Sequence, residues 1–438
     1  DDQSFNTLKA CGNTEIKTPN IDRLVDQSLH FTNTYNMGSW IPAVCMPSRM
    51  MLNTGKFLWK SKNAPEEQFP KKQMWSQRIK SAGYKTYMAG KWHVFYNGDW
   101  REKVDPKDVF DVVGTLRPGM PKDTPEGYNR PKNGNDTSWL PWDKTKGGYW
   151  EGGKHWTEVQ GEEIINFIEL ASKEDEPYFI YSAFNAPHDP RQSPKEFVDM
   201  YSLDSISIPK NFLSEYPYKD QIGCPESLRD ERLAPFPRTE YAVKVNIQEY
   251  YAIITHLDKQ IGLILKKLEE LGEQDNTYIF FTADHGLACG QHGLMGKQNL
   301  FDHSVRVPFL VSGPGIEGGT KCNTPIYLQD IMPTTLEISG AKKSGVDFKS
   351  LIPLIQDNQK KHYNSIYGAY MHLQRMITKD GYKLIYYPEA SKFLLFDLNK
   401  DPDEINNLAE KSEYSSKLEE MKSSLVLLQK EMNDPMLE

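Results

Sequence analysis

One cysteine stands where it could act as a nucleophile. Cys45 opens the run Cys-Met-Pro-Ser-Arg at residues 45–49, in which Pro47 and Ser48 can begin a helix. A side chain at a helix N-terminus lies in a positive field, which favours an anionic nucleophile or a bound oxyanion. Arg49 follows one turn later and can point to the same place. Most cysteines of such a chain are simply buried, but this pattern predicts a reactive centre at Cys45.

A cation and a base follow in a second short motif. Lys91 and His93 lie in Gly-Lys-Trp-His at residues 90–93, after the strand-like run 84–89. Two side chains that are two positions apart on an extended segment face the same side. In isolation the pair would be an ordinary solvated turn. Beside Cys45 it predicts one cation that holds an oxyanion and one base that moves a proton.

Carboxylates suitable for a metal occur in two separate places. Asp284 and His285 follow the apolar run 278–282, which reads as a strand buried on both faces. Acids at the carboxyl end of a parallel strand lie where α/β sheets bind their ligands. Together with Asp1 and Asp2 they offer three carboxylates and an imidazole. Hard oxygen ligands in that number suit Ca²⁺, or Mg²⁺ when waters complete its shell.

The two motifs resemble those of a known enzyme family. Cys-x-Pro-Ser-Arg, continued by Leu-Asn-Thr-Gly-Lys at 52–56, resembles the signature of the type I sulfatases of the alkaline-phosphatase-like superfamily. Gly83 to Thr86, with the motif at 90–93, resembles their second signature. The resemblance implies that a formylglycine-generating or equivalent enzyme oxidises Cys45. The hydrated aldehyde then attacks sulfur with one hydroxyl, and collapse of the other, with His93 as base, expels sulfate.

The resemblance also implies roles for residues further along the chain. The segment 185–188 resembles the one whose histidine protonates the leaving oxygen, and His188 takes that role. Lys297 matches the second lysine, which bridges sulfate and leaving group, while Arg49 and Lys91 neutralise the sulfate.

The family's metal site consists of an Asp-Asp pair, the modified cysteine and a later Asp-Asn or Asp-His pair. The resemblance therefore adds Cys45 to the metal ligands of this chain. His285 in the last position matches only part of the family, so the metal's identity stays open.

The elements that position these residues alternate between helix and strand. A helical period runs over 247–271 and is followed at once by the strand 278–281. We therefore expect an α/β fold with a mostly parallel central sheet sandwiched by helices, and an upstream strand before Asp1. The predicted division is a catalytic domain over 1–345, with a long surface insertion at 97–155, and a C-terminal α+β subdomain over 346–438 with a small antiparallel sheet and a helix.

Composition limits the partners. The 438 residues carry a net charge of −8, which argues against nucleic acid. No apolar run approaches the ~18 residues of a membrane span. The five cysteines form no disulfide framework, and the four other than Cys45 are expected to be structural. Relatives of this kind are generally exported, so a periplasmic, surface or extracellular location is expected.

A sulfated glycan is the expected substrate. Arg191, His372 and Arg375 are candidates for binding its anionic groups. Tryptophans typical of a sugar cleft are Trp100, Trp139, Trp142, Trp150 and Trp156. The overall look is closest to bacterial polysaccharide sulfatases. A phosphodiesterase or phosphonate monoester hydrolase of the same superfamily is the alternative. A glycan-binding protein without catalysis is disfavoured because each catalytic position is filled.

Overall fold

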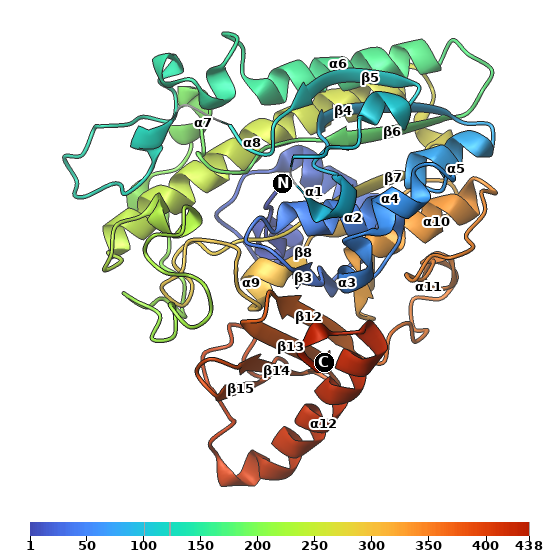
Figure 1. Ribbon diagram of the computed structural model, residues 1–438. Helices are drawn as coiled ribbons and strands as arrows, with labels where there is room; N and C mark the ends of the chain where they lie inside the picture. The colour runs from blue at the N-terminus through green and yellow to red at the C-terminus, as the bar shows by residue number, and fades with distance from the viewer. Residues whose placement is uncertain (100, 122–123, 438) are drawn as a thin grey trace.

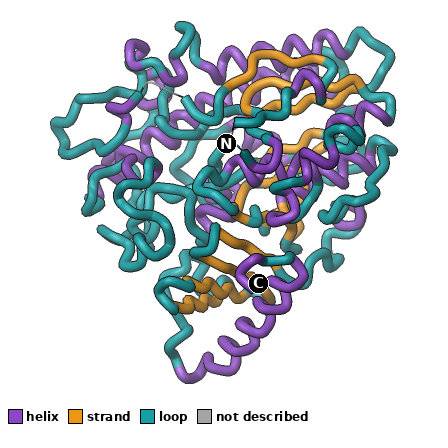
Figure 2. The backbone as a smooth tube through the Cα atoms, in the orientation of Figure 1, coloured by secondary structure: helices purple, strands orange, loops and turns teal. Residues whose placement is uncertain are grey.

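A computed structural model describes residues 1–99, 101–121 and 124–437, so the predicted sugar contact Trp100 lies outside the described residues. Figure 1 shows a larger α/β part, with the C-terminal strands and one long helix gathered at one end. Long loops connect many elements of the larger part (Figure 2).

The helices lie close to where the sequence predicts them. The predicted helix over 247–271 begins earlier, because the Thr239 hydroxyl accepts a hydrogen bond from the backbone N–H of Ala242 and caps α8. The α-helices are α1 (Pro19–Asp26), α2 (Cys45–Thr54), α3 (Leu58–Ser61), α4 (Ala64–Gln68), α5 (Trp75–Ser81), α6 (Trp156–Ala171), α7 (Lys195–Val198), α8 (Glu240–Glu270), α9 (Asp302–Val305), α10 (Ile331–Ile338), α11 (Ile352–Gln356) and α12 (Ser415–Met432).

The strands form several sheets. Their bounds are β1 (Leu29–Phe31), β2 (Thr34–Tyr35), β3 (Gly38–Ser39), β4 (Lys85–Lys91), β5 (Val112–Arg117), β6 (Tyr178–Ala183), β7 (Ile279–Thr282), β8 (Arg306–Val307), β9 (Phe309–Ser312), β10 (Thr320–Cys322), β11 (Ile326–Tyr327), β12 (Ile366–Tyr370), β13 (Gln374–Lys379), β14 (Tyr382–Tyr387) and β15 (Lys392–Asp397). The sheet β5-β4-β6 is parallel, whereas β10-β1-β9-β7 is mixed, with β9 antiparallel to both of its neighbours. A small third sheet has the order β11-β2-β8. The predicted α/β class is confirmed, with helix α6 packed on the sheet β5-β4-β6 and helix α8 packed against α6 (Figure 1).

Two details differ from the prediction. The segment 97–155 is not a surface insertion throughout, because it contributes β5, which pairs with β4. Strand β7 was expected to be buried on both faces, yet its residues are only half-buried. A cavity of about 680 Å³ lies between β6 and β7 and explains this exposure.

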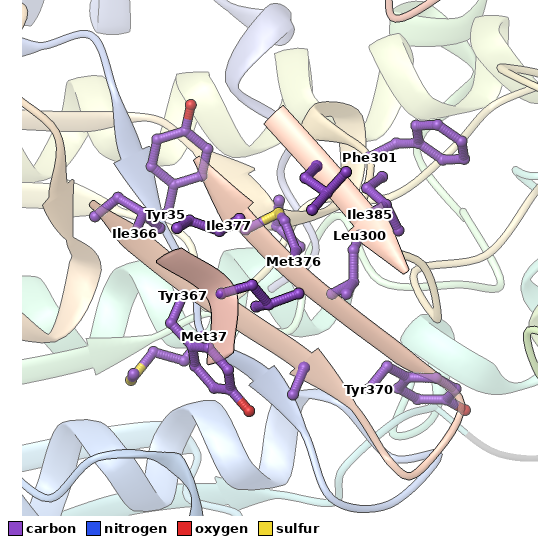
Figure 3. Packing of buried hydrophobic residues seen from close by; sticks show 14 of the residues in the cluster. Tyr35, Met37, Leu300, Phe301, Ile366, Tyr367, Tyr370, Met376, Ile377 and Ile385 are labelled. Carbon is purple, nitrogen blue, oxygen red and sulfur yellow. The ribbon is translucent and has the colours of Figure 1, made fainter. Parts of the chain in front are cut away.

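The C-terminal sheet has the order β15-β14-β13-β12-β3, so its last strand comes from the N-terminal part of the chain. The predicted antiparallel strands are present, with α12 packed on β13. Figure 3 shows the core that joins this sheet to the rest, in which Tyr35 and Met37 meet Tyr367 and Met376. A division of the chain at residue 345 stays a prediction.

Two further findings concern the helices and the cysteines. Across 1–99, 101–121 and 124–437, the structure contains no helix with the length and apolar character to cross a bilayer. The cysteines are all free thiols: Cys11, Cys45, Cys224, Cys289 and Cys322.

Candidate active site

Helix α2 begins at Cys45 and carries this residue into a buried position. The helix follows the short strand β3 and ends at Thr54, with Gly55 as its C-cap; the φ of Gly55, 67°, is the left-handed conformation that suits glycine. Its first turn is tied to the end of β7, because the Ser48 hydroxyl donates to the carbonyl oxygen of Asp284 at 2.7 Å. The cysteine therefore lies at a helix N-terminus and beside the end of a strand, as the sequence predicts.

Three carboxylates surround this cysteine. One candidate ligand atom from each of Asp1, Asp2, Cys45 and Asp284 lies within 4.8 Å of the others, and all four side chains are buried. The backbone N–H of Asp2 donates to Asp284 Oδ1 at 3.2 Å. Asp1 Oδ1 is buried with no hydrogen-bond partner among the described residues. An acceptor left unpaired in a buried cluster of acids fits a hard divalent cation.

Each of these carboxylates is paired with one cation. Lys91 Nζ contacts Asp1 Oδ2, Lys297 Nζ lies 2.5 Å from Asp2 Oδ2, and Arg49 Nε donates to Asp284 Oδ2 at 2.9 Å. These three ion pairs bring together residues from both ends of the α/β part.

Burial and charge set the protonation of this cluster. Burial alone raises the pKa of the Asp284 carboxyl, but Arg49 and the other positive charges around it, Lys91 and Lys297 among them, together outweigh burial and hold that pKa well below its usual range. Burial, helped by Asp2, raises the pKa of the Cys45 thiol. The unmodified side chain is therefore a protonated thiol at neutral pH, and a thiol is a much weaker nucleophile than a thiolate.

His188 also lies close to Cys45, in the loop after β6. Its Nε2 is 3.1 Å from Lys297 Nζ, and that Nζ is also 3.1 Å from Cys45 Sγ. Lys297 Nζ thus contacts both the Cys45 sulfur and the imidazole. The remaining ring nitrogen, Nδ1, faces Asp189.

His93 follows β4 in a strained backbone conformation. Its φ of 60° is uncommon for a residue other than glycine, and its Nδ1 is buried without a hydrogen-bond partner among the described residues. Burial, with Lys91 and Arg49 nearby, lowers the pKa of His93 well below its usual value, so the ring is neutral and able to act as a base. Such strain often marks a functional position.

His285, predicted as a metal ligand, is not among the residues that the structure brings together. Its Nδ1 lies 2.8 Å from the carbonyl oxygen of Gly286, and the residue falls outside the groups of candidate ligand atoms. Burial lowers the pKa of His285 to about 4. A direct bond from His285 to the metal therefore stays a prediction.

The three predicted substrate contacts lie in different environments. Arg375 is fully buried and binds Asp434 through two hydrogen bonds, Nε to Oδ2 and Nη2 to Oδ1, so its predicted role as a substrate contact is wrong. Its partner is 59 residues away in sequence. His372 is exposed and lies 3.5 Å from Glu389 Oε1. Arg191 is buried, with Nε and Nη2 unpaired among the described residues.

Several contacts in the site were not predicted. The Tyr250 hydroxyl donates to the carbonyl oxygen of Asp2 and accepts from the backbone N–H of Ser4. Asp189 contacts His188, as described above. Tyr250 fits the apolar period of α8, which hid its polar role, whereas the position of Asp189 next to His188 was a signal that could have been used.

Comparisons with known proteins cover nearly the whole chain. The family model described as Sulfatase matches residues 1–341, and the one described as N-sulphoglucosamine sulphohydrolase, C-terminal, matches residues 290–431. The chain is 29% identical over 439 residues to an ulvan-active sulfatase of Formosa agariphila, which covers 95% of this chain and 77% of the relative. It is 23% identical over 516 residues to an N-acetylglucosamine-6-O-sulfatase of Bacteroides thetaiotaomicron, covering 99% of this chain and 86% of the relative.

Solved structures share the fold. A structure of a protein in complex with its substrate D-glucosamine-2-N,6-O-disulfate matches with a TM-score of 0.77 and 22% identity, over 99% of this chain and 97% of the other. The phosphonate monoester hydrolase of Agrobacterium radiobacter matches with a TM-score of 0.74 and 19% identity, over 99% and 94%. At these identities the likeness concerns the fold.

Proposed function

The chain belongs to the sulfatase family and is a sulfuric ester hydrolase, and from this premise we propose that it removes sulfate esters from a sulfated carbohydrate. The substrate in this proposal is a polysaccharide or the oligosaccharides derived from it. One observation carries the proposal: Lys297 Nζ is 3.1 Å from both Cys45 Sγ and His188 Nε2, inside a buried group of carboxylates. A position for the nucleophile, a cation for the sulfate and a proton donor are thus in contact.

Two groups complete the proposed site. Asp1, Asp2, Asp284 and residue 45 would hold a divalent cation, Ca²⁺ by preference or Mg²⁺, which would supply charge to polarise the sulfate oxygens. Oxidation of Cys45 by a formylglycine-generating or equivalent enzyme would supply an aldehyde. Its hydrate has one hydroxyl that would attack sulfur, giving its proton to Asp284, and a second hydroxyl whose collapse to the aldehyde would expel sulfate. The raised pKa of the thiol supports the need for this change, because the thiol itself is a weak nucleophile.

The side chains of the site divide the remaining work. Lys91, Lys297 and Arg49 supply positive charge where the oxygens of the reacting sulfate gain negative charge. When the bond between sulfur and the leaving oxygen breaks, that oxygen keeps the electron pair and is protonated through His188 Nε2, which accepts a proton from the Lys297 ammonium 3.1 Å away and passes it on. His93, at the end of β4, is neutral and can accept a proton from the second hydroxyl.

The carbohydrate substrate is supported by the relatives. The names of the two relatives given above refer to ulvan and to N-acetylglucosamine 6-O-sulfate. Arg191 and His372 remain our candidates for contacts to the sugar or its anionic groups. Export to the periplasm, cell surface or medium is part of the same proposal, and fractionation of cells that make the full-length protein would test it; recovery with the cytosol alone would contradict export.

Sulfate release from defined sulfated oligosaccharides tests the proposed function. Ion chromatography would measure free sulfate, and mass spectrometry of the peptide that contains residue 45 would establish the formylglycine content. We expect the protein that carries formylglycine to release sulfate. The Cys45→Ala variant should release none, although its circular dichroism spectrum should match that of the wild type. Release at the wild-type rate by Cys45→Ala would refute the proposed nucleophile.

A second candidate function is hydrolysis of phosphodiesters or phosphonate monoesters. It is supported by the likeness of the fold to a phosphonate monoester hydrolase. Rates on 4-nitrophenyl sulfate, bis-4-nitrophenyl phosphate and 4-nitrophenyl phenylphosphonate, measured on the same preparation, separate the two. A higher kcat/KM on either phosphorus ester than on every sulfate ester would replace the first candidate by the second.

A further inference from the structure

The loop that carries His188 also holds a carboxylate directly against the imidazole. His188 Nδ1 is 2.7 Å from the carbonyl oxygen of Asp189 and 3.2 Å from its Oδ1. Both oxygens are acceptors, since several neighbours, Arg229 foremost, offset the effect of burial and lower the pKa of the Asp189 carboxyl. Nδ1 must therefore carry the hydrogen, and Nε2 is the nitrogen left to face Lys297.

Asp189 is itself fixed by residues from two other segments. The Tyr128 hydroxyl donates to Asp189 Oδ2 at 2.6 Å. Arg229 Nη2 lies 3.6 Å from Asp189 Oδ1, while Arg229 Nε donates to Asp230 Oδ1 at 2.8 Å. The carboxylate is 3% exposed, so these contacts are shielded from water. Tyr128 comes from the segment 97–155 and Arg229 from the loops between α7 and α8.

We propose that Asp189 is a positioning residue for His188: it keeps one hydrogen on Nδ1, so that Nε2 can accept a proton from Lys297 and pass it to the leaving oxygen. Tyr128 holds the carboxylate in the orientation that this task requires. The inference rests on the proposed function for the role of His188, and it adds a reason for the loop 97–155 to reach the reaction centre. Functional histidines are often oriented in this way, by a neighbouring residue that binds the second ring nitrogen.

The variant Asp189→Asn tests the orientation with little change of shape. Tyr128 donates to Oδ2, so the amide oxygen of the asparagine would face Tyr128 and its NH₂ group would face His188. That group is a donor and would compete with the carbonyl oxygen of residue 189, which stays near Nδ1, so a share of the rings should carry the hydrogen on Nε2 instead. Tyr128→Phe removes the same orienting hydroxyl and leaves Asp189 in place.

Long-range ¹H–¹⁵N spectra of the histidine-labelled, metal-loaded protein read the tautomer without any substrate. The signals of His188 are identified by their loss in His188→Gln. We expect the hydrogen on Nδ1 in the wild type, on Nε2 in part or in full in Asp189→Asn, and on Nδ1 in the control Asp199→Asn. Asp199 is an exposed acid that pairs with Lys195. The wild-type tautomer in Asp189→Asn, or a wild-type hydrogen on Nε2, overturns the proposal.

A second test compares kcat and KM on one sugar sulfate, glucosamine 6-sulfate, with those on the aryl ester 4-nitrophenyl sulfate. A sugar alkoxide needs a proton far more than a nitrophenolate does. Loss of orientation should therefore lower kcat on the sugar sulfate by about 10²-fold in Asp189→Asn and by about 10-fold in Tyr128→Phe, with a much smaller change on the aryl ester. Equal losses on both esters overturn the positioning role. Absence of sulfate release by the wild type from every one of the defined sulfated oligosaccharides refutes the proposed function instead, and the tautomer spectra still decide whether Asp189 orients the ring.

Discussion

The replacement Arg375→Met should lower the free energy of unfolding of the protein and leave its catalytic constants unchanged. The guanidinium is buried between β13 and the residues that follow α12, where Nε and Nη2 bind the two oxygens of Asp434 at 2.5 and 2.7 Å. Nη1 donates to the carbonyl oxygens of Met371 and Gln374. Methionine keeps much of the side-chain volume but none of these hydrogen bonds.

The size of the effect follows from what Asp434 retains. Removing one partner of a buried ion pair costs about 3–5 kcal/mol, chiefly because the other charge is left buried and unpaired. Asp434 would keep hydrogen bonds from the Tyr367 hydroxyl and the Gln429 amide, both at 2.8 Å, and from the backbone N–H of Met436 at 3.0 Å. These donors offset part of the loss, so we expect the low end, about 3 kcal/mol.

Urea unfolding followed by tryptophan fluorescence would measure this loss, with kcat and KM determined on the same samples under native conditions. The control is Arg101→Met, because Arg101 pairs with Asp99 on the surface and its side chain is 71% exposed. That variant should leave the unfolding midpoint unchanged. An Arg375→Met protein with wild-type stability and a raised KM would refute the structural role and restore the predicted substrate contact.

Three further results are expected. EDTA should abolish sulfate release and Ca²⁺ restore it, because buried carboxylates form the ligand group; full activity in protein shown by mass spectrometry to be metal-free would contradict this. Lys297→Ala should lower kcat by about 10²–10³, whereas the exposed Lys210→Ala should not, and equal rates in the two would remove Lys297 from the site. Burial raises the pKa of Asp434, but the hydrogen bonds and charge of Arg375, together with hydrogen bonds from Met436 and Gln429, outweigh burial, and the net pKa is lowered. The stability that the Asp434 carboxylate adds is thus present above about pH 4, and it is lost as the pH falls through the pKa of Asp434 in the folded protein. The urea midpoint should therefore fall more steeply below pH 4 in the wild type than in Arg375→Met. Parallel curves for the two proteins would contradict this.

Residues that follow a strand or begin a helix could be placed from the sequence. Cys45 begins α2, Lys91 ends β4, and Asp284 comes two residues after β7, and the structure brings all three together. Local pattern suffices for such positions, because strand ends in an α/β fold converge on one edge.

Arg375 shows where that reasoning stops. Its position near the C-terminal strands was visible, but its partner Asp434 lies 59 residues further on and is brought close by the packing of α12 against β13. The expected burial of β7 failed for a similar reason, since burial depends on which strand lies alongside and not on the apolar run itself. Neither property is encoded in a local window of sequence.

The charges of the site link the two ligands that it is proposed to bind. Three carboxylates and three cations face one another in pairs, so they balance before anything binds. A divalent cation would draw on the same three carboxylates, and Arg49, Lys91 and Lys297 would then have charge to offer a sulfate ester. Each ligand should therefore strengthen the binding of the other, because coupling between two sites is reciprocal. Calorimetric titration of the protein with inorganic sulfate should give tighter binding with Ca²⁺ than after EDTA treatment; equal affinities would mean that the cations are already available, and that their pairing with the carboxylates does not restrain them.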